Sequence, residues 1–370
     1  MEFSISKSAL QKELGFVQGV VEKKNTIPVL SNILIESVGE NTLRITGTDL
    51  DVTIRCETEA EIKTPGAICV QARKLFDISR LLPEATVNFQ KEENDWVSVK
   101  CQNFRSKIPG IPRENFPEVP NFKSAPMKLP AEVFKSFVDK TIFAITQEES
   151  RYTLSGAKFI LDKSGAKMVT TDGHRLAYVE RRDLGKNAPK ETLDALIPRK
   201  TLAELTKLTA GFEEEISLGS DENHIYFEVG PRLLISRRLS GQFPNYEMVM
   251  PKGNDKSIRF DSAQLNQAIR RVALMADDRS HAIRFHLEPK QLQISSQNAE
   301  EGDASEIVAT EYDGETTEIG FNAQYLQDFL NVVGEGEVNF EFKDGNSQAQ
   351  LRPAENGDYD YKYVVMPMRI

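Results

Sequence analysis

The sequence predicts an α+β protein built from three tandem copies of one unit of roughly 125 residues. Three observations lead to this prediction. Helical patterns of apolar residues recur at a nearly constant spacing, and alternating strand patterns recur in the same frame. The chain, at 370 residues, also exceeds the size at which a single hydrophobic core stops growing, roughly 250–300 residues.

Each unit opens with one helical pattern and contains a second. The first pattern begins at Leu10, Phe134 and Leu265, and the second begins at Leu75, Leu202 and Leu326. Together they predict helices over residues 7–21, 72–83, 131–142, 199–209, 261–274 and 323–333.

Strand patterns keep the same frame as the helices. Equivalent strands are predicted at Leu43–Thr46, Lys167–Thr170 and Leu292–Ser295. With two helices among about eight strands, each unit should be mainly antiparallel sheet with both helices packed on one side.

Proline-rich and turn-rich segments mark the boundaries between units. Six prolines lie between residues 109 and 130, which favours an extended connector. A second turn-rich stretch follows at Pro251–Asn254. We therefore expect domains at residues 1–120, 128–250 and 251–370.

Composition excludes several classes of protein. Hydrophobic residues make up 39% and charged residues 28%, as in ordinary globular proteins. The three cysteines contain no C-x-x-C pair, so we expect buried free thiols and neither a disulfide framework nor a zinc ribbon. No apolar run approaches the roughly 18 residues of a membrane span, and residues 1–6 alternate like a strand. We expect a cytoplasmic protein with no membrane partner.

No catalytic motif stands out. The sequence lacks the G-x-S-x-G, P-loop and G-x-G-x-x-G patterns, and its four histidines lack metal-ligand spacing. Asp49 and Asp51 could hold a divalent metal, which leaves a metal-dependent phosphohydrolase or nuclease as the enzyme alternative. In the same frame the second unit has Asp172-Gly173, a hairpin-turn signal, and this favours a turn at both places. We expect a binding protein with no catalytic residue, cofactor or metal.

Charge is distributed unevenly along the chain. The six predicted helices carry twelve basic residues against seven acidic ones, whereas the whole chain has a net charge of −10. Lysine and arginine are good helix formers on solvated faces, which is one explanation. The other is a helix-lined surface that faces the phosphates of a nucleic acid. Without a zinc finger or recognition helix, such binding would be directed at the backbone and independent of sequence.

Several segments, in this order along the chain, match a known family: Thr26–Leu30, Thr46–Leu50, Ala72–Lys74, Thr171–Ala177, Pro198–Lys200 and Tyr363–Ile370. Over essentially its whole length the sequence resembles the bacterial DNA polymerase III β subunit, the ring-shaped sliding clamp. The resemblance implies three clamp domains, a head-to-tail homodimer that closes a six-domain ring, and helices that line the hole. It also implies partners: double-stranded DNA, a clamp loader, and the replicative polymerase and other proteins with short clamp-binding peptides.

Simple geometry supports two chains per ring. A domain of about 120 residues has a radius of gyration near 13.6 Å, hence a diameter of roughly 35 Å. Three such spheres in a ring leave a gap of about 5 Å, whereas six leave about 35 Å. A duplex is roughly 20 Å across, so one chain cannot encircle it and two can.

The resemblance also implies three sets of site residues. The DNA contacts are Lys24, Arg73, Arg151, Arg199 and Lys200. The partner-peptide pocket comprises Leu154, Thr171, Gly173, His174, Arg175, Leu176, Pro244, Met248, Val249, Val364, Met366, Pro367, Met368, Arg369 and Ile370. The dimer interface comprises Ile78, Arg105, Lys107 and Ile108 on one side and Leu274, Met275, Glu300, Glu301, Asp303 and Glu306 on the other. Glu148 and Glu149 depart from the family pattern beside the loop of Arg151.

Overall fold

A computed structural model describes the chain except for residues 22–26, 121–125, 149, 186–188, 190, 301, 356 and 370. The chain divides into two compact units. Unit 1 comprises Met1–Phe134 and Lys200–Arg238, and unit 2 comprises Lys135–Arg199 and Leu239–Ile370. The middle third of the sequence therefore contributes to both units.

Unit 1 contains a 13-stranded sheet in the order β10-β15-β16-β17-β4-β3-β2-β6-β9-β8-β7-β1-β5. Its first strands and helices are β1 (Glu2–Ser6), α1 (Lys7–Val17), β2 (Asn32–Val38), β3 (Thr42–Thr48), β4 (Val52–Glu59), β5 (Glu61–Thr64), β6 (Ala67–Gln71) and α2 (Ala72–Leu81). The remaining strands are β7 (Thr86–Lys91), β8 (Trp96–Cys101), β9 (Phe104–Ile111), β10 (Met127–Pro130), β15 (Glu215–Ser220), β16 (His224–Val229) and β17 (Arg232–Arg237). Helices α3 (Ala131–Thr141) and α4 (Arg199–Leu208) have residues in both units.

Unit 2 contains two sheets. One has eight strands in the order β14-β11-β12-β13-β25-β24-β23-β18, and the other has four in the order β21-β20-β19-β22. The strands from the middle third are β11 (Gly156–Asp162), β12 (Gly165–Thr171), β13 (Arg175–Arg181) and β14 (Leu193–Pro198). The last third supplies β18 (Lys256–Asp261), α5 (Ser262–Ala273), β19 (Ala282–Glu288), β20 (Gln291–Asn298), β21 (Gly302–Ala309), β22 (Thr317–Asn322), α6 (Ala323–Val333), β23 (Glu337–Phe342), β24 (Ala349–Pro353) and β25 (Asp360–Val365).

The α-helices in the described part of the chain lie where the apolar patterns predict them, and the sheets are antiparallel throughout. Only the end of α1 differs by more than two residues, because α1 ends at Val17 instead of residue 21. The amides of Gln18 and Gly19 bond back to Leu14 and Phe16, and glycine disfavours further helix. Val20 is nevertheless fully buried, which explains why the apolar pattern continues beyond the helix.

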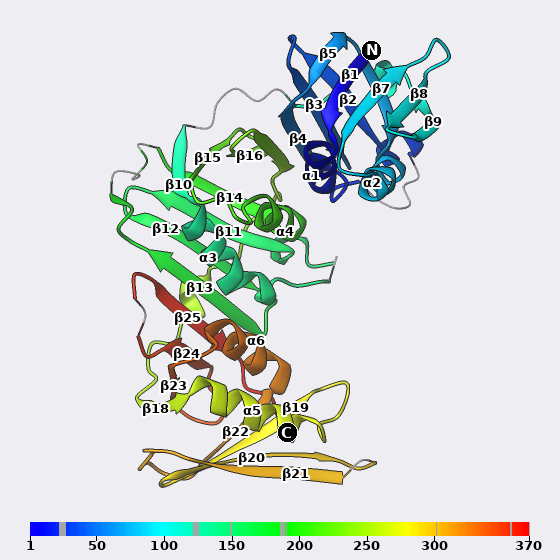
Figure 1. Cartoon of the computed structure of the whole chain (residues 1–370). Coiled ribbons are helices and arrows are strands. Elements are labelled where there is room, and N and C mark those ends of the chain that lie inside the picture. Colours follow the sequence, from blue (N-terminus) through cyan, green and yellow to red (C-terminus); the bar gives the residue numbers. More distant parts are fainter. Residues whose placement is uncertain are drawn as a thin grey trace. The chain divides into compact units, whose positions relative to one another are not determined.

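Each first helix follows a strand without a loop, and two of them begin at a side-chain cap. Ser6 accepts a hydrogen bond from the amide of Ala9 at 3.3 Å, and Asp261 accepts one from Gln264 at 2.7 Å. Helices α1 and α2 lie side by side within unit 1, as α5 and α6 do within unit 2 (Figure 1). In the first and third repeats, the two helices therefore pack side by side against a sheet, as the sequence predicts.

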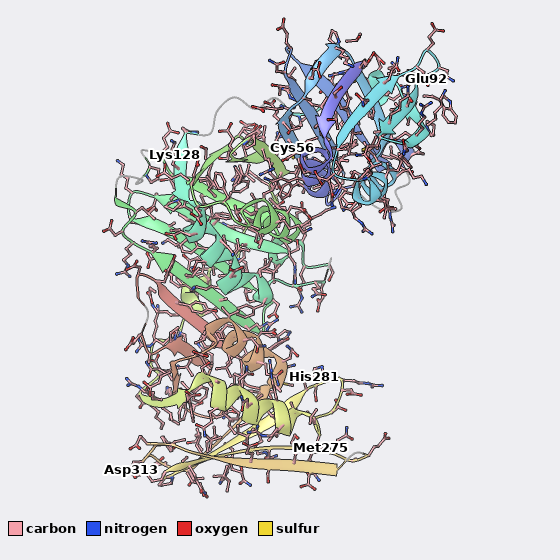
Figure 2. All side chains as sticks on the ribbon, viewed as in Figure 1. Cys56, Glu92, Lys128, Met275, His281 and Asp313 are labelled. Carbon is pink, nitrogen blue, oxygen red and sulfur yellow. The ribbon has the colours of Figure 1, made fainter. Side chains whose placement is uncertain are left out.

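The three cysteines are free thiols buried in unit 1, and Figure 2 marks Cys56. Burial raises the pKa of the Cys56 thiol above its usual range and raises that of Cys69 to about 12. These two thiols remain protonated at neutral pH. The burial of all three cysteines confirms the prediction of buried free thiols.

Neighbouring repeats are joined by antiparallel strand pairs. Strand β4 of the first repeat pairs with β17 of the second, through Val52–Cys56 and Arg232–Ser236. Strand β13 of the second repeat pairs with β25 of the third, through Arg175–Glu180 and Asp360–Val365. Each pair lies within one unit, and each makes a sheet that continues from one repeat into the next. The sheets are therefore not confined to single repeats.

A buried ion pair reinforces the first of these joints. The guanidinium of Arg232 in β17 donates to both carboxylate oxygens of Glu13 in α1, at 2.8 and 2.6 Å. Their side chains are only 9% and 6% exposed, so each charge depends on the other. The helix of one repeat is thus locked to a strand of the next.

Substitution of Arg232 by alanine should destabilise unit 1 by about 3–5 kcal/mol, because Glu13 would remain buried without a partner. Trp96, the only tryptophan of the sequence, lies in β8 of unit 1, so its fluorescence in urea reports this loss. The control is Lys63→Ala, which removes an exposed pair with Glu2 and should cost less than about 1 kcal/mol. Equal losses in the two variants would contradict the assignment.

Candidate functional site

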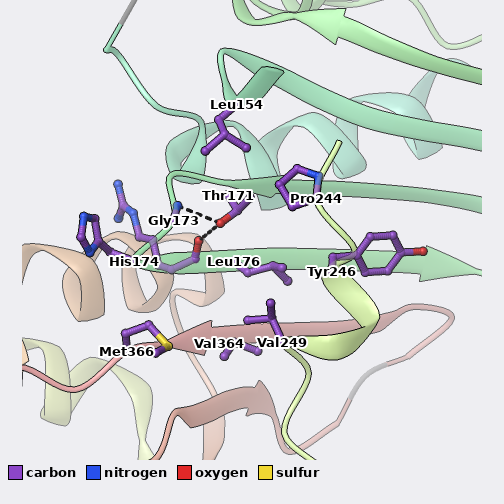
Figure 3. Close-up of a pocket in the computed structure, with 11 residues that line it drawn as sticks. Leu154, Thr171, Gly173, His174, Leu176, Pro244, Tyr246, Val249, Val364 and Met366 are labelled. Carbon is purple, nitrogen blue, oxygen red and sulfur yellow. Dashed lines mark hydrogen bonds between the residues drawn. The ribbon is translucent and has the colours of Figure 1, made fainter. Parts of the chain in front are cut away.

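An open, apolar pocket with a volume of about 110 Å³ lies in unit 2 (Figure 3). Its volume is of the same order as the ~150 Å³ apolar cavity that accepts benzene in a protein core. The lining residues are Leu154, Thr171, Gly173, His174, Arg175, Leu176, Pro244, Tyr246, Val249, Val364 and Met366. The structure therefore brings together most of the side chains assigned to the peptide pocket and adds Tyr246.

Pairing between β13 and β25 builds the floor of the pocket. Leu176 lies opposite Val364 in this pair, and the two pack with Val169 as a buried apolar cluster. The segment that carries Pro244 and the short helix η6 (Tyr246–Met248) covers one side, and Tyr246 packs against the cluster. Leu154, at the end of the short helix η4 (Tyr152–Leu154), lies on another side (Figure 3). A floor of this composition favours an apolar side chain from a ligand.

The turn between β12 and β13 forms the polar rim. Asp172 accepts hydrogen bonds from the amides of His174 and Arg175, at 2.9 and 3.0 Å. Thr171 donates to the carbonyl of Arg175 at 2.6 Å and accepts from the amide of Gly173 at 3.1 Å (Figure 3). Gly173 has φ +92°, a conformation that residues with a side chain rarely adopt. The turn predicted from Asp172-Gly173 is therefore present in the structure.

Arg175 fixes this turn to neighbouring elements. Its guanidinium bonds Asp172 at 2.9 Å, Asp328 of α6 at 2.6 Å and the carbonyl of Phe143 at 2.8 Å, and it lies 4.2 Å from the ring centre of Tyr325. Burial disfavours its charge, but the neighbouring Tyr363 and the two carboxylates outweigh this effect and raise the pKa of Arg175. With a side chain only 9% exposed, Arg175 holds the rim in place more than it offers a free cation.

The other residues assigned to the pocket lie outside its lining. Met248 is 77% exposed on η6, next to the lining residue Val249. Pro367, Met368 and Arg369 follow Met366, and the amide of Met368 donates to the carbonyl of Gly320 at 2.8 Å. Ile370 lies outside the described residues. The chain beyond Met366 is thus held against β22 at Met368.

The residues assigned to DNA differ in how free their charges are. Arg73 on α2 is 68% exposed and lies 4.0 Å from Asp77. Arg151 bonds Glu148 at 3.0 Å and the carbonyl of Asp172 at 2.7 Å, and Arg199 bonds the carbonyl of Ile145 at 3.2 Å. Lys200 forms an ion pair with Asp49. Lys24 and Glu149 lie outside the described residues. Of the residues that can be placed, Arg73 is the most accessible cation.

The acidic pair that suggested a metal site is engaged in a turn. Asp49 accepts hydrogen bonds from the amides of Asp51 and Val52, at 2.9 and 2.6 Å, and also binds Lys200. Asp51 lies 3.6 Å from Arg237. In the residues that the structure covers, no group of three or more side chains could hold a metal ion. These contacts are those of a hairpin turn.

Several residues assigned to the dimer interface, Arg105, Lys107 and Ile108 in β9 and Asp303 and Glu306 in β21, lie on strands with open edges. Residues 104–109 of β9 pair with β8 only, and β21 pairs with β20 only, within the described chain. Arg105, Lys107, Glu300 and Asp303 are exposed, and Leu274 is 73% exposed. Glu306 binds Arg271, whereas Ile78 and Met275 are half-buried. Ile108 is a core residue with 4% exposure, and Glu301 lies outside the described residues.

Two exposed apolar residues on these edges were not predicted from the sequence. Phe104 in β9 is 39% exposed and Ile307 in β21 is 61% exposed. An apolar side chain in a strand is normally a core residue, so only the pairing of the strands reveals that these edges are open.

Comparison with known proteins matches all three parts of the chain. Residues 1–120, 128–245 and 247–369 match the N-terminal, central and C-terminal domain models of the DNA polymerase III beta subunit. The chain belongs to the DNA polymerase III beta subunit family. Relatives include the beta sliding clamps of Pseudomonas aeruginosa, 37% identical, and Escherichia coli K12, 32% identical, each over the full length of both chains.

Solved structures of sliding clamps have the same fold. A P. aeruginosa sliding clamp bound to griselimycin superposes with a TM-score of 0.93 at 36% identity, and the Caulobacter crescentus polymerase III β with a TM-score of 0.92 at 34% identity. Both matches cover the whole of each chain. Membership confirms three clamp domains and a non-catalytic DNA sliding clamp that serves the replicative polymerase. No helix in the described residues is long and apolar enough to span a membrane.

Substitution of Gly173 by alanine should destabilise unit 2 by about 1–2 kcal/mol, because φ +92° strains a residue with a side chain. The new Cβ would also lie 3.0 Å from Nη1 of Arg151. The control is Gly253→Ala, where the backbone is ordinary and the space is open. Urea unfolding followed by circular dichroism measures both. A loss in Gly253→Ala as large as that in Gly173→Ala would argue against a strained turn.

Proposed function

We propose that two copies of this chain close head to tail into a ring that encircles duplex DNA and tethers the replicative polymerase. One observation carries the proposal. At both internal joints, the fourth strand of one repeat pairs with the last strand of the next, β4 with β17 and β13 with β25. The same rule leaves β21 of the last repeat and β9 of the first with open edges in the described chain. A second copy supplies the missing partner for each.

The contact between copies is therefore heterologous, with β21 of one copy against β9 of the other. Such a contact forms a closed ring if the rotation between copies closes, and two copies provide six domains. Unpaired strand edges are templates for pairing with another chain, which supports these edges as the contact.

The register of this contact follows from the two internal joints. On one side we align Cys56, Val179 and Glu306, which lie opposite the buried Ile45, Met168 and Ile294 of the preceding strands. On the other side we align Arg232 and Phe104, which each begin a strand after a two-residue turn. Cys56 pairs with Arg232, and Val179 pairs with Tyr361. We therefore expect Phe104 opposite Glu306, which places Lys107 opposite Asp303. Opposite charges at the second pair would fix the register and the orientation.

DNA would pass along the helices, whose basic residues would make weak contacts with phosphates and would not read the bases. Arg73 is the described residue best suited to this role, because its side chain is 68% exposed. Arg199, Lys200 and Arg151 would first have to release protein partners. Weak contacts that exchange easily allow a closed ring to slide, so retention comes from encirclement more than from affinity.

The apolar pocket would receive short peptides of partner proteins, among them the replicative polymerase and the clamp loader. Its floor of Leu176 and Val364 suits one apolar side chain, and the hydrogen-bonded turn at Thr171–Arg175 limits its entrance. Met366 adds a flexible thioether, which can adapt to peptides of different shape.

Retention on DNA tests the ring directly. After loading by its clamp loader, the protein should stay on nicked circular DNA through gel filtration and should leave the same DNA once a restriction enzyme has linearised it. Equal retention on circular and linear DNA would indicate ordinary surface binding. Failure to stay on either would contradict the proposed function.

Substitution of Leu274 by aspartate should convert the dimer into a monomer, because an unpaired charge would enter the proposed contact between copies. Leu274 is 73% exposed, so the fold of the single chain should survive. Sedimentation velocity measures the change. Met248→Asp, at an equally exposed methionine beside the pocket, should leave the dimer intact. A dimer that persists in Leu274→Asp would rule out this side of the contact.

Truncation of Met366 to alanine should weaken binding of a clamp-binding peptide about 10- to 100-fold, the equivalent of ~1.5–3 kcal/mol for a buried apolar side chain. Fluorescence polarisation of a labelled peptide from the cognate polymerase measures the affinity. Met248→Ala, outside the pocket lining, is the matched control and should change the affinity less than about threefold. A larger effect from Met248 than from Met366 would place the peptide elsewhere.

A further inference from the structure

The first helix of each repeat has a charged or aromatic residue at one equivalent position. Helices α1, α3 and α5 each follow a strand directly, and their tenth residues are Phe16, Lys140 and Arg271. On the last strand of each repeat, Arg232 and Phe104 both begin the strand after a two-residue turn, and Tyr361 pairs with Val179 as Arg232 pairs with Cys56. At both internal joints these two positions come together.

At the first joint, the guanidinium carbon of Arg232 lies 4.3 Å from the centre of the Phe16 ring. At the second, Nζ of Lys140 lies 5.9 Å from the centre of the Tyr361 ring, and the Tyr361 hydroxyl donates to the carbonyl of Lys140 at 2.9 Å. Both distances are within the range of a cation–π interaction. Both internal joints therefore have a cation–aromatic pair. In the first joint the cation is on the strand and the ring is on the helix, and in the second joint the two are exchanged.

At the open edges, the same two positions hold an aromatic ring on the strand and a cation on the helix. Phe104 is 39% exposed, an unusual place for a large aromatic side chain, and the side chain of Arg271 is 57% exposed. Arg271 is already oriented by two hydrogen bonds to Glu306, at 2.8 and 2.6 Å. Glu306 is also the residue that the register places opposite Phe104.

We propose that Phe104 of one copy stacks on the guanidinium of Arg271 in the second copy. This inference rests on the proposed head-to-tail dimer and names the pair of side chains that completes it. The contact between copies then repeats the cation–aromatic pair of both internal joints, in the arrangement of the second, with the ring on the strand. A closed ring of two copies contains this pair twice.

The affinity between copies, measured by sedimentation equilibrium, tests the pair. Phe104→Ala and Arg271→Ala should each raise the dimer dissociation constant roughly 3- to 30-fold, and the double variant should be no weaker than either single one. Phe104→Leu keeps an apolar side chain but removes the π face, and it should weaken the dimer as Phe104→Ala does. Trp96→Ala, at an exposed aromatic residue on the adjacent strand β8, is the control and should have no effect.

An exchange of the two side chains provides the decisive variant. Phe104→Arg combined with Arg271→Phe recreates the arrangement of Arg232 and Phe16, with the new arginine opposite Glu306, so the dimer should return to within about threefold of the wild-type affinity. Single effects that simply add in the double variant, or an exchange variant as weak as the single ones, would overturn the pairing. A wild-type protein that is monomeric at micromolar concentration would contradict the proposed dimer itself.

Discussion

The antiparallel pairing of one repeat's fourth strand with the last strand of the next repeat is the constraint on which the other features depend. It continues the sheets across β4 and β17 and across β13 and β25. Because the pairing brings the end of β25 beside the turn that starts β13, it also creates the pocket, where the amide of Met366 donates to the carbonyl of His174 at 2.9 Å. The pocket is therefore a consequence of a joint between repeats. The first joint carries a different turn, in which Asp49 is bound to Lys200.

The joints differ in how firmly they are fixed. The first has the buried pair of Glu13 and Arg232, and the second has Arg175 bound to Asp328, with side chains 9% and 21% exposed. The side chains available to the proposed contact between copies, such as Lys107, Phe104 and Leu274, are exposed in the single chain. Breaking a buried pair costs more than separating exposed groups. DNA can enter a closed ring only if the ring opens. With buried ion pairs inside each chain and exposed groups between copies, the ring would open between copies and not within a chain.

Local patterns predicted the elements well, and long-range pairing explains what they could not predict. Helical spacing located the helices, and Asp172-Gly173 located the turn, because both depend on neighbours in sequence. The exposed edge around Phe104 could not be predicted, since it depends on which strands find partners. Charge alone did not show that Arg151 and Lys200 are bound to protein groups. Tyr246 was missed because a tyrosine two residues after a proline carries no sequence signal of the distant cluster that it covers.

The central claim, that open edges of two copies pair in the register of the internal joints, can be tested by one disulfide cross-link. The register places Ser106 opposite Ala304, and directly opposite residues in antiparallel strands have Cα atoms about 4.5–5.5 Å apart, within reach of a disulfide. The native cysteines are buried and should not interfere. A chain with Ser106→Cys and Ala304→Cys should oxidise to a covalent dimer that stays on closed circular DNA in SDS. The account would be contradicted if no cross-link formed, or if one formed only with the second cysteine at position 305 instead of 304.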